Sequence, residues 1–233
     1  MISVFDYFKG WLLPLSNLFE GYEEDVFLSL KTSILSESLS CTSMKTPSRK
    51  EEIVIVASRL FKEKGYNAVS MRDIAQAMGI KAASLYNHIQ GKQEILSTLI
   101  LAVAKEFTLS MDNLMESRLR PIEKITNVIE SHIAITVNYP EGLAALNNDW
   151  MHLENEDLRD FIMMREGYEE NFRKIIKEGI ENGEIKGNHP EVILFSILST
   201  LRSLYVWYQK RGKLDVNVLK KDMVAVLLNG ITV

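Results

Sequence analysis

The chain has 233 residues, of which 46% are hydrophobic and 25% are charged, and its formal net charge at pH 7 is −4. These values indicate a globular protein of one or two domains, and they exclude a disordered or collagen-like chain. A single cysteine, Cys41, excludes an internal disulfide framework and favours a reducing compartment. The apolar N-terminus lacks a basic region and is divided by Pro14, so we expect neither a signal peptide nor a membrane partner, and a cytoplasmic location.

The charge is unevenly distributed along the chain. Residues 44–99 carry nine Lys/Arg against five Asp/Glu, a net of +4, whereas residues 1–43 and residues 100–233 each have a net charge of −4. A basic module on an acidic body is typical of a protein that approaches nucleic-acid phosphates with one face. Chance clustering of the basic residues is the alternative.

Residues 1–47 form an N-terminal extension and linker. Two short amphipathic helices, over residues 2–13 and 23–36, are expected ahead of a polar stretch. The extension is either an arm that packs on the body or sequence upstream of a start at Met44, and both interpretations remain open.

The next segment, residues 48–97, begins with a strong helix signal. Ser48 and Glu51 form a capping box, in which each side chain satisfies a free backbone N–H. Apolar residues then recur with the spacing of one helix face, from Ile53 to Phe61, and Gly65 ends the helix.

Two further short helices follow around a glycine turn. Ser70 and Asp73 form a second capping box and open a helix with Ile74, Ala75 and Met78 directed inward. Gly79 interrupts it, and Leu85 and Ile89 give the third helix a buried side before Gly91. Three short helices with tight turns indicate a helix-turn-helix unit.

Residues 81–88, KAASLYNH, are the expected recognition helix. Its small residues allow close approach to DNA, and alanine methyl groups suit thymine methyl groups. The amide of Asn87 suits an adenine edge, and the side chains of Ser84, Tyr86, His88 and Lys92 suit phosphates. Arg72 lies at the start of the preceding helix, where backbone N–H groups favour an anion.

The remainder, residues 98–233, is predicted to be entirely helical, which gives an all-α protein. We expect helices over residues 92–118, 121–138, 141–152, 155–183, 190–210 and 215–229. Pro121 and Pro190 occupy first turns, and Asn155 and Asp215 are expected N-caps.

The stretch "ASRLFKEKGYNAVSMRDIAQAMGIKAASLYNHIQGKQEIL" resembles the DNA-binding domain of the TetR family of bacterial transcriptional repressors. The resemblance implies an N-terminal helix-turn-helix domain followed by a helical domain for effector binding and dimerisation. It implies DNA contacts from Ser70, Met71, Arg72, Lys81, Ala82, Ala83, Ser84, Tyr86, Asn87, His88 and Lys92. Two positions limit the comparison: most of the family has an aromatic residue, usually Phe, where this chain has His88, and the position of Asn87 is variable.

The resemblance also implies a homodimer formed by the last two helices. Residues 191–208 are apolar nearly all round, as in a helix that is buried on two sides, and residues 216–230 carry one apolar stripe. The alternative is that both are intrachain core. The expected interface residues are Phe195, Leu198, Leu201, Arg202, Leu219, Met223, Val226 and Leu227.

The middle helices are expected to bind a small, partly apolar effector. Methionines adapt to varied ligands, and Tyr and Trp combine apolar surface with a polar tip, although such residues also fill ordinary cores. The candidates are Met111, Met115, His132, Trp150, Met151, Phe161, Met164, Tyr168, Phe172, Tyr205 and Tyr208. We expect no cofactor and no metal site, because His132, His152 and Glu154 lack the helical spacing of paired ligands.

These patterns predict a transcriptional regulator, most simply a repressor, that binds palindromic operator DNA as a dimer and is released by its effector. An activating or ligand-independent regulator is the first alternative. A helical small-molecule-binding protein or enzyme is the second, but the sequence lacks a nucleophile elbow, a Gly-rich phosphate loop and paired metal ligands, so we expect no enzymatic activity.

Overall fold

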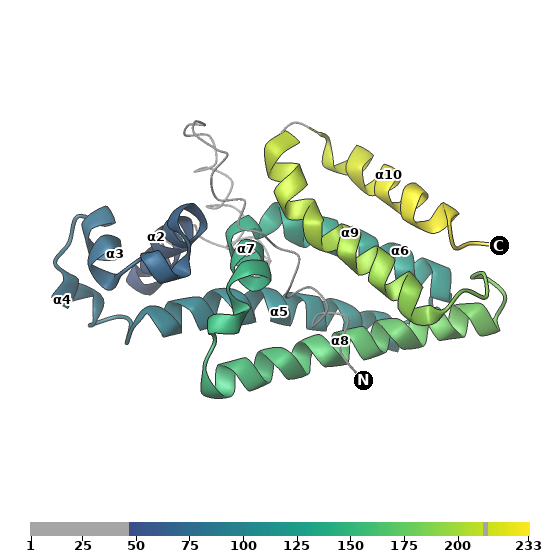
Figure 1. The fold of residues 1–233 in the computed structure, drawn as a ribbon, viewed down its shortest axis with the longest axis horizontal. Coiled ribbons are helices and arrows are strands. Elements are labelled where there is room, and N and C mark those ends of the chain that lie inside the picture. The colour runs from purple at the N-terminus through teal and green to yellow at the C-terminus, as the bar shows by residue number, and fades with distance from the viewer. Residues whose placement is uncertain (1–46, 212–213) are drawn as a thin grey trace, which may run out of the picture. The chain divides into compact units, whose positions relative to one another are not determined.

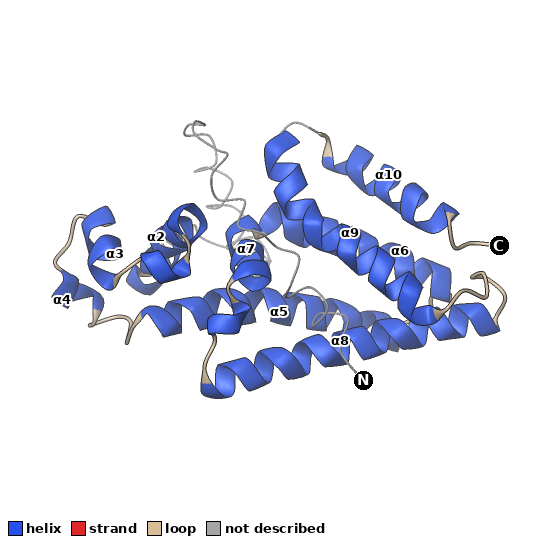
Figure 2. Cartoon of the chain, in the orientation of Figure 1, coloured by secondary structure: helices blue, strands red, loops and turns tan. Residues whose placement is uncertain are grey.

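The computed structural model describes residues 47–211 and 214–233, and their regular elements are all helices (Figures 1 and 2). One isolated antiparallel bridge joins Ile185 and Thr232. The all-α prediction is therefore confirmed. Cys41 and the two helices expected before residue 37 lie outside the described residues.

The head, which we define as residues 48–97, contains α2 (Arg49–Lys64), η2 (Tyr66–Ala68), α3 (Met71–Ala77), α4 (Ala82–Leu85) and the start of α5 (Lys92–Glu116). Both predicted capping boxes are present, at Ser48 with Glu51 and at Ser70 with Asp73. Gly65 and Gly79 adopt φ values of +80° and +66°, which glycine reaches without the steric cost of a side chain.

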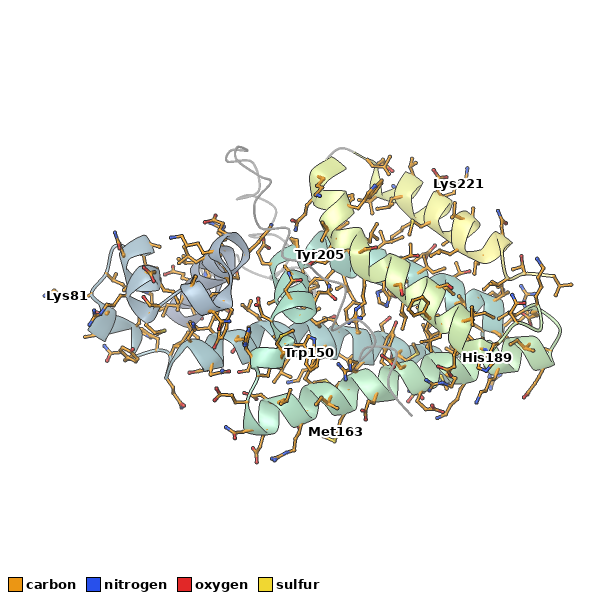
Figure 3. The ribbon with its side chains drawn as sticks, in the orientation of Figure 1. Lys81, Trp150, Met163, His189, Tyr205 and Lys221 are labelled. Carbon is orange, nitrogen blue, oxygen red and sulfur yellow. The ribbon has the colours of Figure 1, made fainter. Side chains whose placement is uncertain are left out.

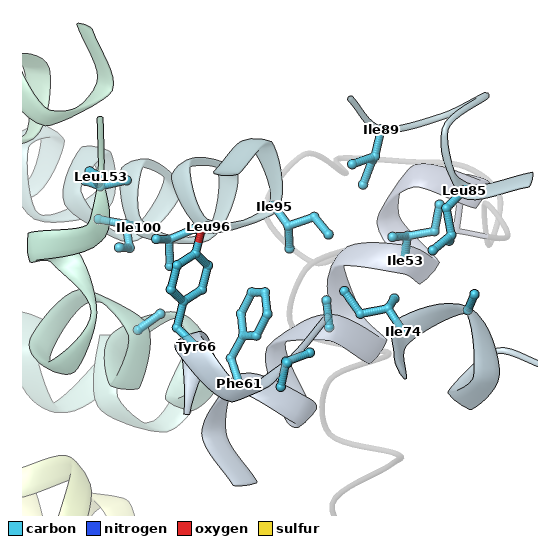
Figure 4. Packing of buried hydrophobic residues seen from close by; sticks show 14 of the residues in the cluster. Ile53, Phe61, Tyr66, Ile74, Leu85, Ile89, Ile95, Leu96, Ile100 and Leu153 are labelled. Atoms are coloured by element: carbon cyan, nitrogen blue, oxygen red, sulfur yellow. The ribbon is translucent and has the colours of Figure 1, made fainter. Parts of the chain in front are cut away.

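One hydrophobic cluster holds the short helices of the head together. Ile53 of α2, Ile74 of α3 and Leu85 of α4 are fully buried against one another's elements, as the sequence pattern predicted (Figure 4). Burying a side chain of this size contributes roughly 1.5–3 kcal/mol, which exceeds what a single helical turn gains from its own hydrogen bonds. The cluster continues past Tyr66 to Leu153, so head and body share one core.

Lys92 fastens η2 to the start of α5. Its ammonium group donates hydrogen bonds to the carbonyl oxygens of Tyr66, at 2.8 Å, and Val69, at 2.9 Å. The same nitrogen lies 4.2 Å from the centroid of the Tyr66 ring. The Tyr66 carbonyl also accepts from the Val69 N–H at 3.4 Å, so Lys92 adds a second donor there and supplies a donor to the Val69 carbonyl.

The body, residues 98–233, is built around α6 (Pro121–Asn138). This helix contacts α5, α7 (Pro140–Asn148), α8 (Asn155–Glu181), α9 (Pro190–Arg211) and α10 (Val216–Asn229), and α5 also packs along α7 and α8 (Figure 1). Its inward residues Ile125, Val128, Ile129 and Ile133 are at most 1% exposed. The predicted first-turn prolines, Pro121 and Pro190, are confirmed, as is the Asp215 cap.

Two predicted boundaries in the body are wrong. The helix expected over 141–152 ends at Asn148 and is followed by a separate 3₁₀ turn, η3 (Trp150–His152). Asn155 does not cap α8, because it is the first helical residue and Glu154 occupies the cap position without a side-chain bond. The φ of Asn155 is +50°, a left-handed conformation that asparagine tolerates better than most residues.

Two glycines of α8 provide a matched test of packing at its C-terminal half. A Cβ on Gly179 would lie 2.5 Å from Ile185 Cδ1 and 3.1 Å from Pro121 Cβ, whereas a Cβ on Gly167 would meet nothing within 4 Å. We expect Gly179→Ala to lower the free energy of unfolding by about 1–3 kcal/mol and Gly167→Ala to raise it by about 0.5–1 kcal/mol. Urea unfolding measures both, and equal effects would contradict this account of α8 packing.

Lys92→Ala should destabilise the head because it removes the ammonium donor shared by the part-buried Tyr66 and Val69 carbonyl groups. We expect a loss of about 1–3 kcal/mol in the free energy of unfolding. Lys81→Ala is the matched control, since Lys81 is exposed, and should change stability by less than about 0.5 kcal/mol. Denaturant melts of the two variants that coincide would rule out the bracing role.

Candidate functional site

Apart from Lys92 at the start of α5, the residues predicted to contact DNA lie on or directly beside α3, α4 and the turn that follows α4. Lys81 lies at the tip of the head and points away from the rest of the chain (Figure 3). Tyr86 is 56% exposed although it is aromatic. The set divides by exposure: Ser70, Arg72, Lys81, Ala83, Ser84, Tyr86, Asn87 and His88 are exposed, and Met71, Ala82 and Lys92 are partly buried.

The regular part of the expected recognition helix is shorter than predicted. α4 ends at Leu85, and residues 86–88 continue as a turn in which the N–H groups of His88 and Ile89 bond to the Leu85 carbonyl at 2.9 and 3.0 Å. Leu85 and Ile89 are buried on the head core. The exposed side chains between them are therefore held by the core more than by helical hydrogen bonds.

The carboxylates that flank this surface are already engaged inside the head. Asp73 accepts hydrogen bonds from the backbone N–H and hydroxyl of Ser70 at 2.7 and 2.5 Å, which lowers the pKa of its carboxyl group. Glu94 accepts from Lys50 Nζ at 2.5 Å and from the N–H of Gln90 at 2.6 Å, and these bonds lower its pKa. No Asp or Glu occurs between residues 73 and 94. The surface thus presents donors and small side chains to an anionic partner.

Two of the residues predicted to contact DNA make structural hydrogen bonds within the head. The Ser70 hydroxyl caps α3, and the Lys92 ammonium bonds the carbonyl oxygens of Tyr66 and Val69. Lys92 in particular is directed at the protein backbone, which corrects the expectation that it reaches outward to a phosphate. Sequence patterns do not reveal this contact, because the carbonyl groups belong to residues 23 and 26 positions earlier in the chain.

Several predicted effector residues meet in the interior of the body. His132 Nε2 and the Tyr168 hydroxyl are 2.8 Å apart, and the Phe107 ring lies 4.5 Å from the His132 ring. The Tyr205 hydroxyl donates to Asn148 Oδ1 at 3.0 Å. Of the remaining candidates, Met111, Phe161 and Phe172 are buried, and Met115, Trp150, Met164 and Tyr208 are partly buried. Met151 is 55% exposed, so its expected place in an interior site is wrong.

His132, Arg202 and Glu169 are buried or partly buried polar groups of the body, and of these only Glu169 was not among the residues predicted from the sequence. Burial lowers the pKa of His132 to about 3, with a smaller contribution from Arg202, so the ring is neutral at pH 7. Burial and the neighbouring Arg165 lower the pKa of Arg202 to about 10. Glu169 is 5% exposed, its pKa is raised by burial, and its Oε1 has no hydrogen-bond partner among the described residues. These groups can bond a polar part of a bound molecule.

The expected dimer residues fall into two groups. Leu198, Leu201 and Leu219 are at most 6% exposed in the single chain, which corrects their assignment, because they pack within their own subunit. Phe195 and Val226 are exposed, and Arg202, Met223 and Leu227 are partly buried. Phe195 lies in an apolar stripe along the outer face of α9, whose other members, Val192, Val206 and Trp207, were not among the expected interface residues; Ser196 and Ser203 lie between them. The spacing of these residues was its available signal.

Membrane-spanning helices and metal-binding clusters are absent from the described ranges. No helix there is long and apolar enough to span a membrane. No three His, Cys, Asp or Glu side chains of the described ranges come together as a metal site would require.

Comparisons with known proteins agree with this organisation. The family model described as "Bacterial regulatory proteins, tetR family" matches residues 53–99, and "Tetracyclin repressor-like, C-terminal domain" matches residues 118–231. The transcriptional repressor KstR2 of Mycolicibacterium smegmatis is 23% identical over 203 residues, which cover 82% of this chain and 94% of that protein.

Solved structures show the same fold. The ketosteroid transcriptional regulator KstR2 of Mycobacterium tuberculosis aligns with a TM-score of 0.76 at 21% identity, over 81% of this chain and 97% of that one. AibR in complex with isovaleryl coenzyme A and operator DNA aligns with a TM-score of 0.67 at 23% identity, over 77% and 97% of the two chains. With both halves of the family pattern matched in order, the helix-turn-helix head and the helical body identify the chain as a member of the TetR family of transcriptional regulators.

Proposed function

We propose that this regulator is a cytoplasmic repressor that binds a palindromic operator as a homodimer and is released by a small, partly apolar effector. The observation that carries the proposal is the exposed surface of α3 and α4, whose flanking carboxylates are engaged inside the head. The name of KstR2 as a transcriptional repressor and the operator DNA in the AibR structure support it.

The head offers two kinds of contact to DNA. Arg72 and Lys81 carry exposed charges suited to phosphates, and the Tyr86 hydroxyl can bond a phosphate oxygen. Ala83 and Asn87 have short side chains suited to base edges in the major groove. Positioning then comes from the first group and sequence preference from the second.

The stripe on α9 supports the dimer. Val192, Val206 and Trp207 are 59%, 37% and 44% exposed in the single chain, and large apolar side chains that share one face usually mark an interface. A twofold pair of heads reads a palindrome when its recognition elements lie about 34–36 Å apart or a multiple of that distance. Dimerisation through α9 and α10 supplies such a pair.

The effector is proposed to reach the body interior near the His132–Tyr168 pair. Phe107 supplies apolar surface there, and the hydroxyl and imidazole supply hydrogen bonds. The isovaleryl coenzyme A of the AibR complex supports an acyl-type effector in this fold. Ligand binding that shifts α5, which connects head and body, would then change the separation of the two heads.

The DNA-contact assignment is tested by salt dependence. We expect Arg72→Ala and Lys81→Ala each to weaken binding to all DNA sequences and to reduce the salt slope by about 0.9 per lost contact, or about 1.8 in a dimer. Fluorescence anisotropy across a salt series on operators selected from random DNA measures this. Asn87→Ala should instead relax base preference at one position, at a cost of about 1–3 kcal/mol.

Lys177→Ala is the control for these substitutions, because Lys177 is an exposed lysine of α8 in the body. An unchanged salt slope in both head variants would contradict the phosphate contacts. Failure of the wild-type protein to select any DNA would contradict the proposed function itself.

The interface on α9 is tested by placing a charge in the stripe. We expect Trp207→Glu to weaken self-association by at least about 2 kcal/mol, roughly 30-fold in the dimer dissociation constant, because an unpaired carboxylate would be buried. Met163→Glu is the matched control, since Met163 is 63% exposed on α8 and lies away from the stripe. Analytical ultracentrifugation in which both variants sediment like wild type would remove α9 from the interface.

A further inference from the structure

The 3₁₀ turn η3 lies at the junction of head and body and makes a different contact on each side. On the head side, the His152 ring stacks on the Tyr66 ring, with centroids 5.3 Å apart and an angle of 24° between the planes. Asn67 Nδ2 lies 3.3 Å from His152 Nε2. The His152 side chain of η3 therefore contacts both of the first two residues of η2, Tyr66 and Asn67.

A second set of bonds fixes the backbone of the turn. Gln93 Nε2, at the start of α5, donates to the His152 carbonyl at 2.7 Å and to Glu154 Oε1 at 3.0 Å. Lys92 bonds to Tyr66 of η2, and the next residue of α5, Gln93, bonds to His152 of η3. The orientation of the Tyr66 ring is thus set jointly by α5 and by His152.

The other side of η3 faces α8. The Trp150 ring lies 5.7 Å from the Phe161 ring, and the Arg165 guanidinium carbon lies 4.8 Å above the Trp150 ring. Arg165 also acts electrostatically on Glu169 and Arg202 in the polar interior of the body. Trp150 thus lies on the side of η3 that faces the body interior, two positions before His152, which contacts the head. Figure 3 shows Trp150 over the first part of α8.

We propose that η3 couples the body to the head, with His152 as the positioning residue that sets the head's orientation. The proposal rests on the proposed function, since a head orientation matters for a palindrome read by two heads. A change at Arg165 that moves the Trp150 ring shifts a rigid three-residue turn, and His152 carries the shift to Tyr66. Beside the core that head and body share, the His152 side chain adds only the stacked pair and the contact with Asn67, which are weak enough for ligand binding to open them.

The neighbour Met151 separates this role from simple packing. Met151 belongs to the same turn but is 55% exposed and points to solvent, so its truncation leaves both contacts of η3 in place. His152→Phe keeps a ring for the stack and loses the bond to Asn67, and His152→Ala loses both. These three variants form a graded series on one structural element.

The first measurement is the dependence of DNA binding on half-site spacing. Palindromes selected from random DNA are rebuilt with one or two base pairs added or removed between the half-sites, and their affinities are compared with that of a single half-site. We expect His152→Ala to flatten the spacing preference by about fivefold or more, with half-site affinity unchanged, because its heads are no longer held at one orientation. Met151→Ala should keep the wild-type preference, and His152→Phe should lie between.

The second measurement needs no DNA. Hydrogen exchange of the full-length protein, followed for the peptide covering residues 65–72, should be faster in His152→Ala and in Arg165→Met than in wild type and Met151→Ala. Arg165→Met removes the cation above Trp150 from the far side of the turn. Exchange like that of wild type in either variant overturns the coupling, as does a full spacing preference in His152→Ala. If wild type selects no palindrome, the proposed function fails, and hydrogen exchange still decides the coupling.

Discussion

The surface proposed to contact DNA depends on how two buried side chains, Leu85 and Ile89, anchor a segment that has little structure of its own. α4 contains four residues, too few for a helix to be stable through its own hydrogen bonds. Leu85 is fully buried and Ile89 is 2% exposed, so the residues between them are displayed by their attachment to Ile53 and Ile74. The head core therefore positions the site as well as stabilising the fold.

Hydrogen bonds within the head also decide the roles of the charged residues near its basic surface. Asp73 accepts hydrogen bonds from Ser70, and Glu94 accepts them from Gln90 and from the Lys50 ammonium group, so both carboxylates stabilise the starts of helices. Lys92 is a cation close to the recognition segment, but its ammonium group donates hydrogen bonds to the carbonyl oxygens of Tyr66 and Val69 and so is directed away from a ligand. The charges that face a ligand are therefore those that the backbone of the short elements does not bind, and the number of lysines in the segment does not identify them.

Local patterns predicted much of this structure. Both capping boxes, the glycines with positive φ, the first-turn prolines and the inward faces of the head helices follow from short-range rules, and each is present. Contacts between distant residues could not be predicted in the same way. Lys92 meets Tyr66 and Val69, His152 meets Tyr66, and Leu198 and Leu201 face their own subunit, because tertiary packing selects partners that periodicity does not identify. Periodicity shows that a helix has an apolar side, and α9 has apolar residues on more than one side, so the pattern left open which side meets α8 and which faces outward.

The outward apolar stripe of α9 also affects how long a newly made single subunit persists before it is aggregated or degraded. In the proposed dimer, Val192, Val206 and Trp207 of each new subunit remain in contact with water until a second copy covers them, and such an exposed apolar patch is prone to non-specific association. At low abundance the encounter between copies is slow, and solitary chains are the ones that chaperones and proteases intercept. The supply of working regulator would then rise more steeply than its rate of synthesis, which gives the cell a threshold set by the surface of one helix.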